Sequence, residues 1–260
     1  MRIPYYRVSA FTKDPFGGNP AGVCPLEKWL PDELMLRIAA ENNLSETAFF
    51  VREGEKIRLR WMTPAVEVDL CGHATLATAA VLFFEMGYKG DRVAFETRSG
   101  AVAAGRRGDL VELDFPVWRP KPCPVPKGLS EALGCAPREL FSVTRDYLAV
   151  VETEEEVRSL APNMEALMKV DRDGVIVTAR GKDADFVSRF FGPRVGIPED
   201  PVTGSAHCAL IPFWAERLGK KEMAARQISK RGGELYCRLE GERVKIAGNA
   251  VVYQRGEILI

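Results

Sequence analysis

The chain has 260 residues, which is enough for one large domain or for two lobes that each bury a core. Lys and Arg together number 36, as do Asp and Glu, so there is no charge excess to attract nucleic acid or an anionic membrane. The six cysteines lack C-x-x-C spacing, which favours reduced thiols and no structural metal. The chain also lacks a signal-type apolar stretch at its start and an apolar run long enough to cross a bilayer, so we expect a soluble cytoplasmic protein.

The residue pattern predicts a strand-rich chain with two surface helices. These helices are predicted at residues 31–41, where Pro31 suits a first turn, and at residues 154–160. Alternation and β-branched or aromatic content predict strands, in chain order, at residues 5–10, 47–51, 57–62, 93–97, 101–105, 110–115, 140–144, 147–151, 175–179, 186–191, 226–229, 235–239, 244–247 and 251–254.

One long apolar helix is predicted in each half. Residues 72–85 are apolar almost all round, so a sheet is expected to wrap around this helix, which ends at Gly87. Residues 204–218 are similar and end at Gly219. Pro212 lies inside this second helix, where it removes one backbone hydrogen bond and is expected to kink the axis.

Prolines recur through residues 116–127, a stretch that does not suit a central strand. We interpret this stretch as the crossing between an N-terminal lobe, residues 1–116, and a C-terminal lobe, residues 117–260. The last strand is free to cross back to the first lobe.

The two halves resemble each other around the only two histidines. Cys71-Gly72-His73-Ala74-Thr75 is similar to Asp200-Pro201-Val202-Thr203-Gly204-Ser205-Ala206-His207, and matched positions continue through two hairpins at a nearly constant spacing. This pattern predicts two lobes related by a pseudo-twofold axis, with two helix amino termini in one cleft. Two such ends could grip a carboxylate through unpaired N–H groups, whereas for either glycine alone a tight turn before a core helix is the alternative.

In their order and spacing, several segments resemble the PhzF-like proteins of phenazine biosynthesis. They are residues 10–23, 43–50, 60–75, 97–100, 114–116, 185–207 and 227–235, and they cover essentially the whole chain. The resemblance implies an α+β, diaminopimelate epimerase-like fold of two lobes, each with a sheet rolled around a central helix. It also implies an isomerase that needs no metal or cofactor, and a homodimer. Four residues match the motifs without a role that we can derive: Asn19, Arg98, Gln227 and Ser229.

The resemblance implies that Glu46, in Ser45-Glu46-Thr47, is the general acid/base for proton transfer on a small cyclic or unsaturated amino or hydroxy acid. Its apolar neighbours are expected to remove this carboxyl partly from water, which lets it hold and release a proton near neutral pH. The residues alone leave open an edge-strand glutamate in solvent.

His73, Asp200 and Ser205 match family positions that line the ligand pocket, and the two helix-start glycines, Gly72 and Gly204, are expected to bind the substrate carboxylate with them. Asp200 is expected to orient His73, although without the family it reads equally well as a turn residue or helix cap. His207, one turn into an apolar helix, is expected to be structural.

Cys71 carries a rival hypothesis, because the epimerases and racemases that this fold resembles use one cysteine from each half as paired bases. Counting back from Thr203-Gly204 places Pro201 at the matching position, so the second thiol is absent and a buried structural thiol is the simpler interpretation. The residues also leave open a thiol hydrolase in which His73 activates Cys71, and a non-catalytic ligand-binding or protein-interaction module.

Overall fold

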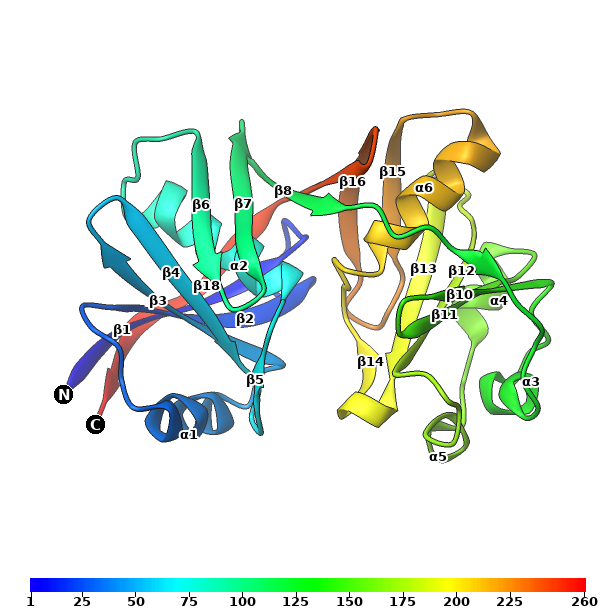
Figure 1. The fold of residues 1–260 in the computed structure, drawn as a ribbon, viewed down its shortest axis with the longest axis horizontal. Helices are drawn as coiled ribbons and strands as arrows, with labels where there is room; N and C mark the ends of the chain where they lie inside the picture. The colour runs from blue at the N-terminus through cyan, green and yellow to red at the C-terminus, as the bar shows by residue number, and fades with distance from the viewer. The chain divides into compact units, whose positions relative to one another are not determined.

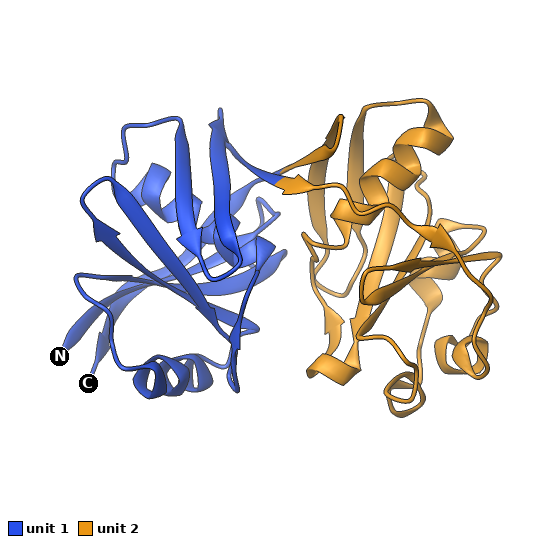
Figure 2. Cartoon of the chain, in the orientation of Figure 1, with its two compact units in different colours: residues 1–114, 247–260 blue, residues 115–246 orange.

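The computed structural model describes residues 1–260, which form two compact units (Figures 1 and 2). Unit 1 comprises Met1–Asp114 and Ala247–Ile260, and unit 2 comprises Phe115–Ile246. The first unit therefore ends slightly before residue 116, and it includes the carboxyl-terminal residues from Ala247 onward. None of the helices has the length and apolar character needed to cross a membrane.

Unit 1 is built on nine strands, of which β8 and β18 adjoin the chain crossings. They are β1 (Arg2–Ala10), β2 (Asn19–Leu26), β3 (Glu46–Glu53), β4 (Lys56–Met62), β5 (Glu67–Val68), β6 (Arg92–Thr97), β7 (Gly100–Arg107), β8 (Leu110–Pro116) and β18 (Ala250–Leu259). β1 pairs with β18 and β2 antiparallel, β2 with β3 parallel, β3 with β4 antiparallel, and β4 with β5 antiparallel and β6 parallel. Helix α1 (Asp32–Asn42) lies between β2 and β3 in the sequence, and α2 (Gly72–Ala80) continues into the π-helix η1 (Val81–Glu85).

Unit 2 repeats this arrangement. Its strands are β9 (Lys121–Pro122), β10 (Glu139–Val143), β11 (Asp146–Val150), β12 (Gly174–Arg180), β13 (Phe186–Gly192), β14 (Ile197–Asp200), β15 (Glu222–Gln227), β16 (Gly233–Glu240) and β17 (Arg243–Gly248). β10 pairs with β9 and β11 antiparallel, β11 with β12 parallel, β12 with β13 antiparallel, and β13 with β14 antiparallel and β15 parallel. The helices are α3 (Leu129–Leu133), α4 (Glu154–Ser159), α5 (Met164–Leu167), the 3-10 helix η2 (Pro193–Val195) and α6 (His207–Leu218).

The strand registers make the internal repeat specific at the level of residues. Thr47 pairs with Met62 in unit 1 as Val175 pairs with Phe191 in unit 2. In the same way, Trp61 pairs with Val68 in unit 1 as Phe190 pairs with Asp200 in unit 2. The position of Val68 in unit 1 is therefore that of Asp200 in unit 2, and continuing along the chain matches Gly72 with Gly204. By the same register, Glu46 corresponds to Gly174.

The long helix of each unit is largely buried, as its composition predicted. Every residue of α2 is buried, and the helix packs against β1, β2 and β3. The predicted stops are confirmed, because Gly87 and Gly219 both adopt the left-handed conformation. Pro212 lies within α6, as expected.

The start of α6 differs from the prediction. The helix begins at His207 rather than at Gly204. The N–H of His207 donates to the Gly204 carbonyl and that of Cys208 to the Ser205 carbonyl, so residues 204–206 form a tighter turn that leads into the helix.

Several strands were missed or misplaced. β2 was missed because Pro20, Gly22 and Pro25 obscure its pattern, and β5, β9 and β14 are too short to show alternation. β15 spans Glu222–Gln227, several residues before the predicted 226–229.

The turn between β1 and β2 requires a glycine at residue 18. Gly18 has a φ of +62°, and a Cβ there would lie 2.2 Å from the Ala10 carbonyl oxygen. Gly54, at a φ of +64°, has no atom within 4 Å of such a Cβ.

We expect Gly54→Ala to lower the free energy of unfolding by about 1 kcal/mol and Gly18→Ala by about 3 kcal/mol, since the latter adds a backbone clash to the left-handed strain. Denaturant unfolding of both variants measures the difference, and equal losses would contradict this reading of the turn.

Candidate functional site

Glu46 lies in the interior of the unit 1 sheet. It is the first residue of β3, which is paired on one side with β2 and on the other with β4, and Ala21 is its register partner on β2. Its residue is only 7% exposed. The alternative of a solvent-exposed edge-strand glutamate is therefore wrong.

Cys71 and His73 lie at the start of α2, whose first turn is fixed by a side chain. The Thr75 hydroxyl donates to the Cys71 carbonyl at 2.5 Å, in addition to the Thr75 backbone N–H at 3.2 Å. The imidazole of His73 lies between two groups: its Nδ1 is 3.5 Å from the Cys71 Sγ, and its Nε2 is 3.2 Å from the Glu46 Oε2. All three residues are buried.

Burial determines the charge state of His73. Removal from water lowers the pKa of His73 to about 3, so the ring is neutral at physiological pH. A neutral imidazole carries one N–H, which can sit on either nitrogen. With the thiol donating to Nδ1, the N–H is at Nε2 and faces a carboxylate; with the N–H at Nδ1, Nε2 can accept a proton from a carboxylic acid. In this structure Nε2 and Oε2 are close without being aligned as a hydrogen bond.

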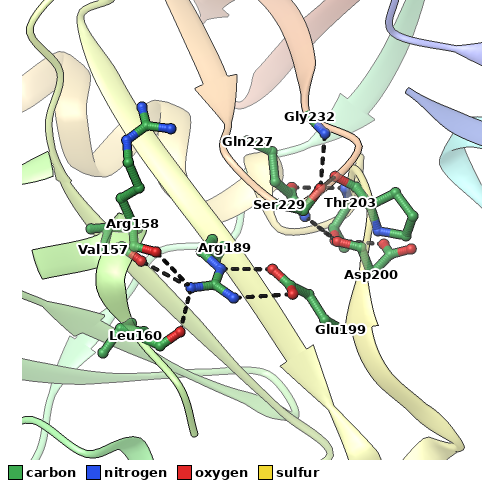
Figure 3. A network of polar contacts seen from close by, with 11 residues as sticks. Val157, Arg158, Leu160, Arg189, Glu199, Asp200, Thr203, Gln227, Ser229 and Gly232 are labelled. Carbon is green, nitrogen blue, oxygen red and sulfur yellow. Dashed lines mark hydrogen bonds and ion pairs between the residues drawn. The ribbon is translucent and has the colours of Figure 1, made fainter. Parts of the chain in front are cut away.

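In unit 2, Asp200 belongs to a hydrogen-bonded turn (Figure 3). The Thr203 hydroxyl donates to the Asp200 carboxylate at 2.5 Å. The Gln227 amide donates to the Asp200 carbonyl at 2.8 Å and accepts the Thr203 N–H at 2.8 Å. The Ser229 hydroxyl donates to the Pro201 carbonyl at 2.8 Å. Gln227 and Ser229, whose roles the sequence left open, therefore hold the turn that carries Asp200.

A paired arginine and glutamate anchors the segment before each central helix. Arg60 binds both carboxylate oxygens of Glu67, at 2.8 and 2.7 Å, and Arg189 binds both of Glu199, at 2.7 and 3.0 Å (Figure 3). The two arginines occupy matching places in the sequence repeat, and this match could have indicated from the sequence that they share a role. Their partners were missed because the spacing after each arginine differs. Arg98, also without an assigned role, adds a bond to Glu67 at 3.2 Å.

The register of unit 2 corrects one correspondence. Because Gly72 matches Gly204, the counterpart of Cys71 is Thr203, and not Pro201 as counted from the sequence. The conclusion that the second thiol is absent stands, since the counterpart carries a hydroxyl. Of the residues predicted to bind substrate, Gly72 and His73 lie in unit 1, and Asp200, Gly204 and Ser205 lie in unit 2.

Comparison with known proteins agrees with the sequence resemblance. The profile of the PhzC-PhzF family, phenazine biosynthesis-like proteins, matches residues 8–256. The chain belongs to this family. An uncharacterised isomerase of Pseudomonas aeruginosa is 54% identical to it over 258 residues, covering 99% of each chain.

Comparison with solved structures identifies the fold. A PhzF-family protein of Enterococcus faecalis superposes with a TM-score of 0.98 at 47% identity, over 100% of both chains. A hydroxyproline epimerase of Agrobacterium vitis shares the fold with a TM-score of 0.62 at 13% identity, over 99% of this chain and 92% of its own. The predicted α+β, diaminopimelate epimerase-like fold is confirmed.

In the internal repeat of this PhzF-family chain, His207 of unit 2 occupies the place of Thr75 in unit 1. Its side chain is fully buried, and its Nδ1 lies 2.9 Å from the Thr203 carbonyl oxygen, so Nδ1 carries the proton. Thr75 makes the matching contact to the Cys71 carbonyl in unit 1. The structural role predicted for His207 agrees with this geometry.

This burial makes stability depend on pH. Burial lowers the pKa of His207 to about 4, whereas the unfolded imidazole titrates near 6.5. Between these values the unfolded chain binds a proton that the folded chain does not, so the free energy of unfolding falls as the pH falls.

We expect His207→Thr, which keeps a donor for the Thr203 carbonyl, to be less stable at pH 7 but less sensitive to acid. Its slope of unfolding free energy against pH, measured by denaturant unfolding around pH 5, should be smaller by about 1.4 kcal/mol per pH unit. His73 is present in both proteins, so its contribution to the slope cancels when the two slopes are compared. Identical slopes would contradict a buried neutral His207.

Proposed function

We propose that this PhzF-family protein is a cofactor-independent isomerase that moves a proton within a small cyclic or unsaturated amino or hydroxy acid, with Glu46 as the general acid/base. The observation that carries the proposal is the buried Glu46 carboxyl beside a neutral His73, whose Nε2 is 3.2 Å away. The relatives named as isomerases support the reaction class.

In the proposed reaction, the Glu46 carboxylate removes a proton from a substrate carbon, so that a C–H bond breaks and an O–H bond forms. The electron pair left behind is delocalised over the unsaturated acid. The same carboxyl then returns the proton to a second carbon on the same face. Because His73 is neutral, it can present Nε2–H to the carboxylate and a lone pair to the acid, which accommodates Glu46 in both states.

We assign substrate binding to residues of both units. The backbone N–H groups at the start of α2, from Gly72 onward, suit the substrate carboxylate. Asp200, as an acceptor, suits an amino or hydroxyl group. Gly204 and Ser205 belong to the turn that leads into α6 and complete the set.

A second candidate is a thiol mechanism, favoured by one observation: the Cys71 Sγ is 3.5 Å from the His73 Nδ1. In this mechanism His73 activates Cys71 as the base or nucleophile. The absence of a second thiol counts against two-base racemisation, because Thr203 occupies the matching place.

Deuterium incorporation tests the two candidates without a known substrate. The protein is incubated in deuterated water with a panel of small cyclic and unsaturated amino and hydroxy acids, and mass spectrometry detects label. We expect at least one acid to gain deuterium or to isomerise. Glu46→Gln keeps the shape and removes the base, so its rate should fall by about a hundredfold or more. Cys71→Ala loses one contact to His73, and its rate should stay within about tenfold of the wild type.

Two results would change the assignment. A Glu46→Gln protein that keeps its rate, or a folded Cys71→Ala protein that loses it, would move the chemistry from the carboxyl to the thiol. No label in any acid, together with tight binding of one of them, would favour the non-catalytic module.

We also propose a homodimer, from the family resemblance and from the prevalence of twofold assemblies. Light scattering at micromolar concentration should give twice the mass of one chain, independent of further dilution to about 1 μM. A single-chain mass at these concentrations would refute it.

A further inference from the structure

Glu46, Cys71 and His73 bring three kinds of metal-binding atom together. One carboxylate oxygen, one sulfur and one ring nitrogen lie within 4.8 Å of one another, and all three residues are buried. Oxygen, sulfur and nitrogen donors in one cluster are typical ligands of zinc, whereas magnesium and calcium prefer oxygen alone.

One of the ligand separations already suits a tetrahedral ion. Zinc bonds of 2.0 to 2.3 Å place neighbouring ligand atoms about 3.3 to 3.8 Å apart. The Cys71 Sγ and His73 Nδ1, at 3.5 Å, already have this separation. The Glu46 Oε2 faces the other ring nitrogen, Nε2, so this carboxylate must rotate about its side-chain torsions to reach an ion at Nδ1.

The two ligands on α2 are also held in place. The Thr75 hydroxyl and N–H both bind the Cys71 carbonyl, which fixes the backbone between Cys71 and His73. Restrained ligands lose less conformational freedom on binding an ion, which favours affinity.

We propose that Glu46, Cys71 and His73 form an inhibitory site for zinc or a similarly soft divalent ion, with the fourth position left for water. On binding, the Cys71 S–H bond breaks, sulfur bonds to the ion and the proton passes to solvent. The Glu46 carboxylate becomes a ligand and can no longer accept a proton from carbon. This blocking effect rests on the proposed function, whereas the binding itself does not.

Cobalt(II) spectroscopy and zinc equilibrium dialysis on the whole protein test the binding. We expect one ion per chain, visible tetrahedral cobalt bands and a thiolate-to-cobalt charge-transfer band, with no displacement by millimolar magnesium. Cys71→Ala should abolish the charge-transfer band and weaken zinc binding by at least about a hundredfold, and Glu46→Gln by about tenfold.

Cys123→Ala is the matched control, because Cys123 is a partly exposed thiol of unit 2 outside the cluster. It should leave the band and the affinity unchanged. Cys71→Ser, which keeps a hydrogen-bonding atom at the position of the sulfur, serves if the alanine variant unfolds, and should also lose the band. A band that persists without the Cys71 sulfur or disappears with Cys123→Ala, or no stoichiometric binding, would overturn the site.

The deuterium assay then separates the two proposals. Zinc should stop exchange and a chelator should restore it. Absence of metal binding overturns the zinc site and leaves the acid/base assignment of Glu46 untouched. Stoichiometric binding without loss of exchange supports the site but contradicts Glu46 as the base.

Discussion

The complete burial of α2 is the constraint on which the rest of unit 1 depends. A helix that is apolar on all sides gains stability only if the sheet surrounds it, at about 1.5 to 3 kcal/mol for each large side chain. That requirement places the start of the helix beside the first residue of β3, and so brings His73 to Glu46. The Arg60–Glu67 pair fixes β5 against β4 just before the helix begins. The polar cluster is thus a consequence of how the apolar core is packed.

The same backbone carries unequal chemistry in the two units. Where unit 1 has Glu46, unit 2 has Gly174, and where unit 1 has Cys71, unit 2 has Thr203. Unit 2 instead concentrates hydrogen bonds around Asp200, through Thr203 and Gln227. This divergence supports a single acid/base group in unit 1 and binding groups in unit 2, in place of two equivalent bases.

Local pattern sufficed where burial alternates along a strand, as in β4, and where a glycine ends a helix, as at Gly219. It failed where contacts with residues distant in the sequence determine the local structure. The start of α6 is moved to His207 by a turn that Gln227 holds from another strand, and no local signal reports that contact. The approach of Glu46 to His73 likewise depends on packing between β3 and α2. The family resemblance, not periodicity, singled out Glu46 as a candidate.

The neutrality of His73 also bears on which group acts as the base. A cysteine thiolate at an active site is usually stabilised by a nearby cation, often an imidazolium. His73 has a pKa of about 3 and offers no such charge at neutral pH. A free glutamate carboxyl ionises about four pH units below a free cysteine thiol, so it does not depend on a cationic partner to act as a base near neutral pH. The burial that removes the charge from His73 therefore favours proton transfer by Glu46 over a Cys71 thiolate.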